Sequence, residues 1–234
     1  MTAKGTDVNT HSIRQLGLAL LAILAFGGIA ASSAFAVEDK FHSSVEPTVM
    51  TAASEQTTVF GFDAGQFKVE CKKATLSGTF KTKTVAEFET FPTFKECANG
   101  IYDRDECVIR LTGRTPVKDA VIELGCPGTN AMTFTTEICN FHITPQSMEG
   151  VTYTNGKEET TQKKDVTIKF TVTGFTYEKV AVTTNGCNGF GGAGVAHDGT
   201  ITGAFTATGY EDIGGAVENG DEFKEGAVVD FFVE

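Results

Sequence analysis

The chain has 234 residues, of which 41% are hydrophobic and 21% charged, and its formal net charge at pH 7 is −11. This acidic balance argues against nucleic acid and anionic membrane surfaces as partners, because both attract clustered lysine and arginine. The length suits one domain or two small ones and is ample for a hydrophobic core.

Residues 1–36 have the pattern of a secretory signal peptide. A weakly basic start precedes an apolar core at residues 16–30 ("LGLALLAILAFGGIA"), and an A-x-A cleavage motif follows at 34–36. The apolar core is shorter than the roughly 20 residues that a membrane span needs. We therefore expect cleavage after Ala36 and a mature protein that is secreted or held in the cell envelope, with no membrane association after cleavage.

The mature chain is expected to begin with a flexible leader at 37–56, followed by a β-rich domain at 57–234. Nearly every segment of that domain alternates threonine or another polar residue with valine, isoleucine or phenylalanine, which is the period-two pattern of a half-buried strand. The predicted strands are 57–63, 67–73, 74–80, 84–91, 107–113, 119–126, 131–137, 139–145, 150–155, 165–184, 199–210 and 226–234.

Turn chemistry favours antiparallel pairing of these strands. Asn-Gly pairs supply the positive φ angles of tight hairpin turns, and they occur at 99–100, 155–156, 185–186, 188–189 and 219–220. About a dozen short strands with such turns predict an all-β fold, either an antiparallel β-sandwich or a barrel-like domain. The segment 146–150 ("QSMEG") is a candidate break between two sheets or subdomains.

All six cysteines follow the predicted signal peptide: Cys71, Cys97, Cys107, Cys126, Cys139 and Cys187. An even count in an exported chain predicts three disulfide bonds. Zinc binding is the alternative, but the chain has no C-x-x-C pair, and nothing near His142 completes a site around Cys139.

Fifteen pairings of six cysteines are possible, and spacing alone does not select one. The strand pattern favours Cys71–Cys97, because these two residues flank one hairpin-like unit. It next favours Cys107–Cys126, whose flanking segments read as paired strands, and this choice leaves Cys139–Cys187 as the third bond.

The stretch 185–194 ("NGCNGFGGAG") contains a G-x-G-x-x-G fingerprint at Gly189, Gly191 and Gly194, and an acidic residue follows about twenty positions later. In a dinucleotide-binding unit, the third glycine opens a helix whose N–H groups hold the pyrophosphate. The residues after Gly194 alternate like a strand, so we predict a pliable loop anchored by Cys187 and no bound cofactor.

Two alternatives involve exposed ionisable residues. His197 and Asp198 are adjacent in a predicted surface loop and would suit the base of a secreted hydrolase, although the chain has no nucleophile-elbow motif. Two acidic loops would suit a calcium site or a carboxylate-dependent hydrolase, although neither loop has the residue spacing of an EF-hand. Their carboxylates are Asp103, Asp105 and Glu106 in the first loop, and Glu211, Asp212, Glu218, Asp221, Glu222 and Glu225 in the second.

The order of motifs resembles a large group of uncharacterised secreted bacterial proteins that occur as many paralogues per genome. The similarity covers about residues 57–212 and includes a cysteine after the first strands, the strand "ATLSGTF", a second cysteine, the segment "CNFHITPQSMEGVTYTN" and the strand "GTITG". The resemblance implies export, disulfide bonds and β architecture, and it brings no catalytic motif.

We therefore expect an exported, disulfide-bonded β-domain without enzymatic activity, metal or cofactor. It would serve as an extracellular interaction or structural module with an unidentified partner or surface component outside the cell. A secreted hydrolase that uses loop carboxylates or His197 is the first alternative, and a calcium-dependent binding domain is the second.

Overall fold

The computed structural model describes residues 40–103, 106–113, 120–156, 165–213 and 225–234. These residues form strands and one short 3-10 turn, η2 (Asn188–Phe190), and no α-helix occurs among them. Accordingly, no helix in the described part of the chain is long and apolar enough to cross a membrane. The predicted all-β class is confirmed.

Sixteen strands are described. In chain order they are β1 (Phe41–Ser43), β2 (Thr48–Ser54), β3 (Thr58–Phe62), β4 (Phe67–Phe80), β5 (Thr84–Val85), β6 (Glu87–Ala98), β7 (Ile101–Asp103), β8 (Val108–Thr112), β9 (Ala120–Gly125), β10 (Met132–Thr135), β11 (Cys139–Ile143), β12 (Gln146–Asn155), β13 (Asp165–Ala181), β14 (Gly194–Asp212), β15 (Glu225–Val229) and β16 (Phe231–Val233).

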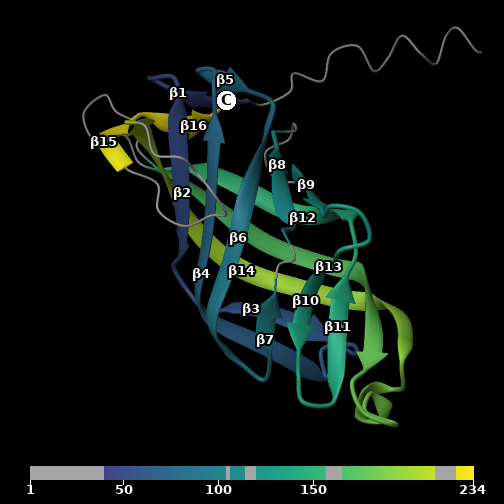
Figure 1. Cartoon of the computed structure of the whole chain (residues 1–234). Helices are drawn as coiled ribbons and strands as arrows, with labels where there is room; N and C mark the ends of the chain where they lie inside the picture. Colours follow the sequence, from purple (N-terminus) through teal and green to yellow (C-terminus); the bar gives the residue numbers. More distant parts are fainter. Residues whose placement is uncertain (1–39, 104–105, 114–119, 157–164, 214–224) are drawn as a thin grey trace, which may run out of the picture. The chain divides into compact units, whose positions relative to one another are not determined.

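Eight strands close into an antiparallel barrel in the order β14-β2-β4-β6-β8-β9-β12-β13, and the pairing of β13 with β14 completes the ring (Figure 1). The longest strands, β4, β6, β13 and β14, extend beyond this ring. There β3 takes the place of β2 between β14 and β4, while β11, β10 and β7 continue outward from β13. Of the two predicted architectures, the structure has the barrel, with extra strands added.

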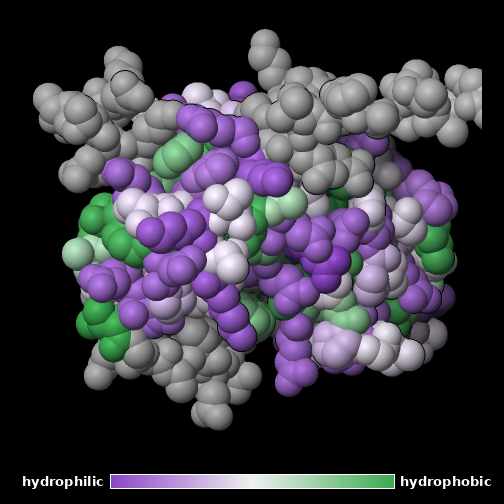
Figure 2. All heavy atoms as spheres, turned by 90° about the horizontal axis from the view of Figure 1, so that it is seen from above, coloured by the Kyte–Doolittle hydropathy of each residue, from purple (hydrophilic) through white to green (hydrophobic). Residues whose placement is uncertain are grey.

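A small sheet in the order β16-β1-β5 covers one end of the barrel, which we call the capped end (Figure 1). Phe41 and Phe231 are fully buried there, with stacked rings whose centroids are 6.2 Å apart. The ring of Phe41 also lies edge-on to Phe88 at 4.8 Å and to Tyr153 at 5.2 Å. Seen from this end, the described surface is mainly hydrophilic, and hydrophobic residues gather in small separate areas (Figure 2).

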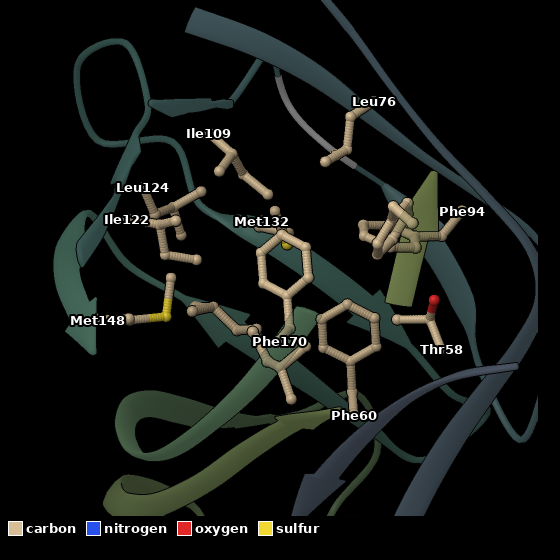
Figure 3. Close-up of a pocket in the computed structure, with 13 residues that line it drawn as sticks. Thr58, Phe60, Leu76, Phe94, Ile109, Ile122, Leu124, Met132, Met148 and Phe170 are labelled. Carbon is tan, nitrogen blue, oxygen red and sulfur yellow. The ribbon is translucent and has the colours of Figure 1, made fainter. Parts of the chain in front are cut away.

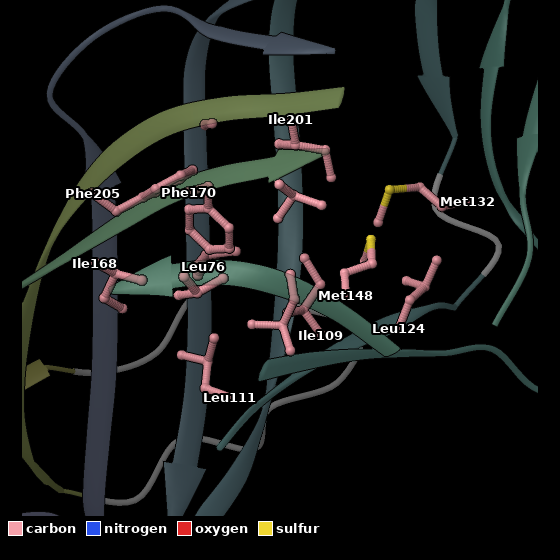
Figure 4. Packing of buried hydrophobic residues seen from close by; sticks show 14 of the residues in the cluster. Leu76, Ile109, Leu111, Leu124, Met132, Met148, Ile168, Phe170, Ile201 and Phe205 are labelled. Carbon is pink, nitrogen blue, oxygen red and sulfur yellow. The ribbon is translucent and has the colours of Figure 1, made fainter. Parts of the chain in front are cut away.

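The barrel interior is a continuous apolar core. Leu76 on β4, Phe170 on β13 and Phe205 on β14 point into it (Figure 4), and the rings of Phe170 and Phe205 are 5.3 Å apart. Because side chains alternate between the two faces of a strand, the threonines between these residues face outward. The period-two pattern of the sequence therefore marks which residues fill the barrel.

The expected flexible leader at 37–56 is wrong for residues 41–43 and 48–54, which form β1 and β2. Val49, Met50 and Ala52 are buried, and β2 pairs with both β4 and β14. Local sequence does not reveal these strands, because their partners lie far away in the chain: Ser54, for example, pairs with Phe205.

The candidate break at 146–150 is also wrong, because these residues lie within β12 of the same barrel. The ladder between β12 and β9 shifts register between Met148 and Val151, which marks a β-bulge. Gly150 has a φ of +96°, and a Cβ at this position would lie 2.6 Å from the carbonyl oxygen of Thr171. The glycine therefore permits a close approach of β12 to its neighbour β13 and does not mark a subdomain boundary.

Candidate functional site

Three disulfide bonds join Cys71 to Cys97, Cys107 to Cys126 and Cys139 to Cys187. The presence of disulfides is as predicted, and these are the three pairs that the strand pattern favoured. Cys71 and Cys97 face each other on β4 and β6, and Cys107 and Cys126 flank the β8–β9 hairpin. Three disulfides indicate folding in an oxidising compartment.

The third bond holds the glycine-rich stretch against β11. Cys187 directly precedes η2, and Gly191, Gly192 and Gly194 all have positive φ angles. Strand β14 then begins at Gly194. The predicted strand is therefore confirmed, and it occupies the position at which a dinucleotide-binding unit needs a helix. The absence of a cofactor stays a prediction.

His197 lies on β14 and not in the predicted loop. The ladder between β13 and β14 shifts register here, and His197 and Asp198 together lie opposite Thr176, as in a β-bulge. The ring Nδ1 of His197 is 2.9 Å from the hydroxyl oxygen of Thr176. Asp198 instead accepts a hydrogen bond from the hydroxyl of Tyr177 (2.8 Å) and another from the backbone N–H of Ala64 (2.8 Å). Asp198 therefore does not orient His197 as a base.

The other histidines and carboxylates are also dispersed. His142 is on β11, opposite Glu178 of β13, and His42 stacks on Phe232 in the cap with 5.0 Å between ring centroids. In the described part of the chain, no group of three or more His, Cys, Asp or Glu residues is placed to hold a metal ion.

The predicted acidic loops are only partly described. Asp103 is on β7, and Glu106 is exposed. Glu211 and Asp212 end β14, and Glu225 begins β15. Asp105, Glu218, Asp221 and Glu222 lie outside the described residues, so the calcium alternative stays a prediction.

A cavity inside the barrel is one candidate binding site (Figure 3). Its volume is about 20 Å³, and its lining is apolar apart from Thr58, whose buried hydroxyl has no hydrogen-bond partner among the described residues. This space is only slightly larger than one water requires, and a buried water needs two or more polar partners. The interior is therefore a packed core and leaves no room for an organic ligand.

A second, larger pocket lies at the opposite end from the cap, which we call the pocket end. It has a volume of about 690 Å³ and opens between the β3–β4, β6–β7 and β10–β11 connections and the loop that contains η2. The lining residues are Phe67, Cys97, Asn99, Gly100, Ile101, Thr135, Thr136, Glu137, Ile138 and Phe190. This volume is in the range of sites for small organic ligands, and barrel mouths are common places for them.

Aromatic packing forms the floor of this end pocket. The ring of Phe67 lies 4.9 Å from Phe141, in a stacked arrangement, and 4.8 Å from Phe190. The Cys139–Cys187 bond fixes the loop that carries Phe190, and the buried ammonium of Lys179 donates a hydrogen bond to the Phe190 carbonyl. The floor is thus preformed, which lowers the entropic cost of binding.

The walls of the end pocket expose apolar side chains to solvent. Ile101 is 73% exposed and Ile138 is 42% exposed. Isolated exposed apolar residues are ordinary, but two of them beside a hollow with an aromatic floor make this hollow a candidate binding surface.

Comparison with known proteins gives no relative. The chain matches no protein-family model, and no curated protein or solved structure is significantly similar to it. The resemblance to a paralogous group of secreted proteins therefore stays a prediction, and the site is interpreted from its own chemistry.

The end pocket was not found from the sequence. Its lining comes from four connections that are far apart in the chain, and each contributes only one or two apolar residues. The sequence contains one relevant signal: an isoleucine lies next to a predicted turn at two positions. Ile101 follows Asn99-Gly100, and Ile138 precedes Cys139. Turns are normally polar, so Ile101 and Ile138 are the residues that sequence reasoning passed over.

Proposed function

We propose that the protein is an exported, non-enzymatic binding module whose site is the end pocket. The observation that carries this proposal is the preformed aromatic floor beside the solvent-exposed Ile101 and Ile138. The opposite end supports it by contrast, because there the small sheet with Phe41 and Phe231 occupies the barrel mouth.

The proposal includes export and processing. The signal-peptide pattern of residues 1–36 and the three disulfides support a mature, extracellular or envelope protein that begins at Val37. Edman sequencing of the exported protein in a bacterial host is expected to start at Val37. An N-terminus at Met1 would contradict this part of the proposal.

A hydrolase centred on His197 receives less support. A general base needs an orienting partner and a nucleophile within hydrogen-bond reach, whereas Asp198 accepts its hydrogen bonds from Tyr177 and Ala64. A panel of sugar and ester substrates is expected to show no turnover by the purified protein. Turnover that His197→Ala or Asp198→Ala abolishes would overturn the non-enzymatic role.

Binding to the end pocket is tested with N-phenyl-1-naphthylamine, a neutral apolar dye that fluoresces on leaving water. We expect the mature protein to bind it, and Ile101→Ser or Ile138→Ser to raise the Kd about fivefold, because each removes about 1 kcal/mol of apolar contact. Val228→Ser is the matched control, since Val228 is 49% exposed on β15, remote from the end pocket. Equal affinities for all variants would contradict the assignment of the site.

A further inference from the structure

The end pocket has one ionisable side chain in its lining. Glu137 lies in the β10–β11 connection between Thr136 and Ile138 and is exposed. Its carboxylate has no ion-pair or hydrogen-bond partner among the described residues. A negative charge therefore stands at the rim of a pocket whose other lining residues are uncharged and mostly apolar.

The charges near the floor have the same net sign. Asp63 and Asp198 carry two carboxylates, and Lys179 supplies one ammonium, which is already bonded to the Phe190 carbonyl. A Cβ placed on Gly191 would be 3.6 Å from the Asp63 carboxylate and 3.6 Å from the Lys179 ammonium, so both groups lie next to η2. Beside η2 the two carboxylates thus outnumber the one buried ammonium, while Lys68, the residue after Phe67 on β4, adds an exposed ammonium at the pocket end.

We propose that the end pocket selects amphipathic cations, molecules with an apolar tail and one ammonium group. The inference rests on the binding role proposed above and adds the ligand class. The tail would lie on Phe67 and Phe190 with Ile138 at its side, and the ammonium would lie beside Glu137. An anion of the same shape would meet unfavourable electrostatics beside Glu137.

Three probes of equal chain length test this preference in calorimetric titrations: octylammonium, 1-octanol and octanoate. We expect octylammonium to bind the mature protein about two- to fivefold more tightly than 1-octanol, the range typical of one exposed ion pair, and octanoate to bind more weakly than either. Glu137→Gln should reduce the differences among the three, and so should high salt, which screens exposed charges. The matched control Glu149→Gln, at an exposed carboxylate on β12, should keep the order.

The outcomes separate this inference from the binding role on which it rests. Equal affinity for all three probes, with Ile138→Ser weakening each of them, would overturn the charge preference and leave the binding role standing. The charge preference is overturned in the same way if Glu149→Gln changes the order as much as Glu137→Gln does. If no probe binds, or if Ile138→Ser leaves every affinity unchanged, the binding role fails as well.

Discussion

At the scale of single residues, Tyr177 organises the polar network under the end pocket. Its hydroxyl accepts a hydrogen bond from the backbone N–H of Asp63 (2.6 Å) and donates one to Asp198 (2.8 Å). Asp63 and Ala64 have φ angles of 52° and 50°, a left-handed conformation that costs non-glycine residues about 1 kcal/mol or more each. The bonds from Tyr177 and Asp198 hold this turn, so Asp198 serves structure where sequence adjacency suggested catalysis.

The environment of Tyr177 leads us to expect a loss of folding free energy at alkaline pH. Burial raises the pKa of Tyr177 from its usual value of 10.0 to about 12, with a smaller upward effect of the Asp198 carboxylate and an opposing effect of the hydrogen bond from the Asp63 N–H. The folded state thus holds the phenolic proton more tightly than the unfolded state. Its contribution to the free energy of unfolding is complete below about pH 10 and is lost as the pH rises toward 12.

Urea denaturation of Tyr177→Phe between pH 7 and 12 tests this argument. At pH 7 the variant should lose about 1–3 kcal/mol, because the Asp63 N–H and the Asp198 carboxylate lose a partner. Its stability should also fall less steeply than that of the wild type above pH 10. Tyr210→Phe, at a half-exposed tyrosine, is the control, and parallel pH curves for Tyr177→Phe and wild type would contradict the prediction.

At the scale of elements, two side-chain amides replace missing backbone pairs. Gln146 donates to the carbonyl of Thr176 (2.6 Å) and accepts from its N–H (2.8 Å), in the gap on β13 between the segments that pair with β12 and β11. Asn155 makes the same two bonds with Val233 of β16, both at 2.8 Å. A primary amide offers the donor and acceptor of a peptide group, which explains why each residue can bridge strands.

The bond pair from Asn155 predicts that this one side chain fastens β16 to β12 of the barrel. Asn155→Ala should lower the free energy of unfolding by about 1–3 kcal/mol, because the N–H and carbonyl of the buried Val233 lose their partner. Amide hydrogen exchange should then speed up in β16 and stay slow in β13. Thr154→Ala, one residue away and exposed, should leave both strands protected; equal exchange in the two variants would argue against the bridge.

The extent to which sequence predicts these elements depends on the range of their contacts. Strands such as β13 and the β8–β9 hairpin were predicted because period-two alternation and nearby cysteines are local signals. In contrast, β1 was missed because its three residues are stabilised by rings such as Phe231 at the other end of the chain. The choice of barrel over sandwich likewise depends on the pairing of β2 with β14, and no local pattern encodes that pairing.

At the scale of the whole molecule, the three disulfides are unevenly placed. They connect β4 to β6, fasten the β8–β9 hairpin and fix the loop before β14 to β11. None involves β1, β2 or β16, so packing and hydrogen bonds alone hold the described strands of the capped end. Covalent reinforcement therefore concentrates on the rest of the barrel, including the floor of the end pocket.

This placement predicts different consequences for two disulfide knockouts. In the chain-entropy description, a disulfide stabilises more when it closes a longer loop. Cys139→Ser with Cys187→Ser opens a 48-residue separation and should lower the free energy of unfolding by about 4 kcal/mol. Cys107→Ser with Cys126→Ser opens a 19-residue separation and should lower it by about 3 kcal/mol. Strong reductant breaks all three bonds of the wild-type protein. It should therefore lower the melting temperature more than either pair of substitutions does. An unchanged melting temperature in reductant would contradict a structural role for the disulfides.

We expect the two double cysteine variants to differ more in ligand affinity than in stability. Of these two disulfides, Cys139–Cys187 is the one that holds the loop carrying Phe190, so its removal should loosen this half of the aromatic floor and add an ordering cost to each binding event. We expect the Kd for N-phenyl-1-naphthylamine to rise at least fivefold in that variant and to stay near the wild-type value without Cys107–Cys126, measured well below both melting temperatures. If both folded variants bind the dye equally well, the end pocket does not depend on Phe190, and its aromatic floor is not the binding determinant.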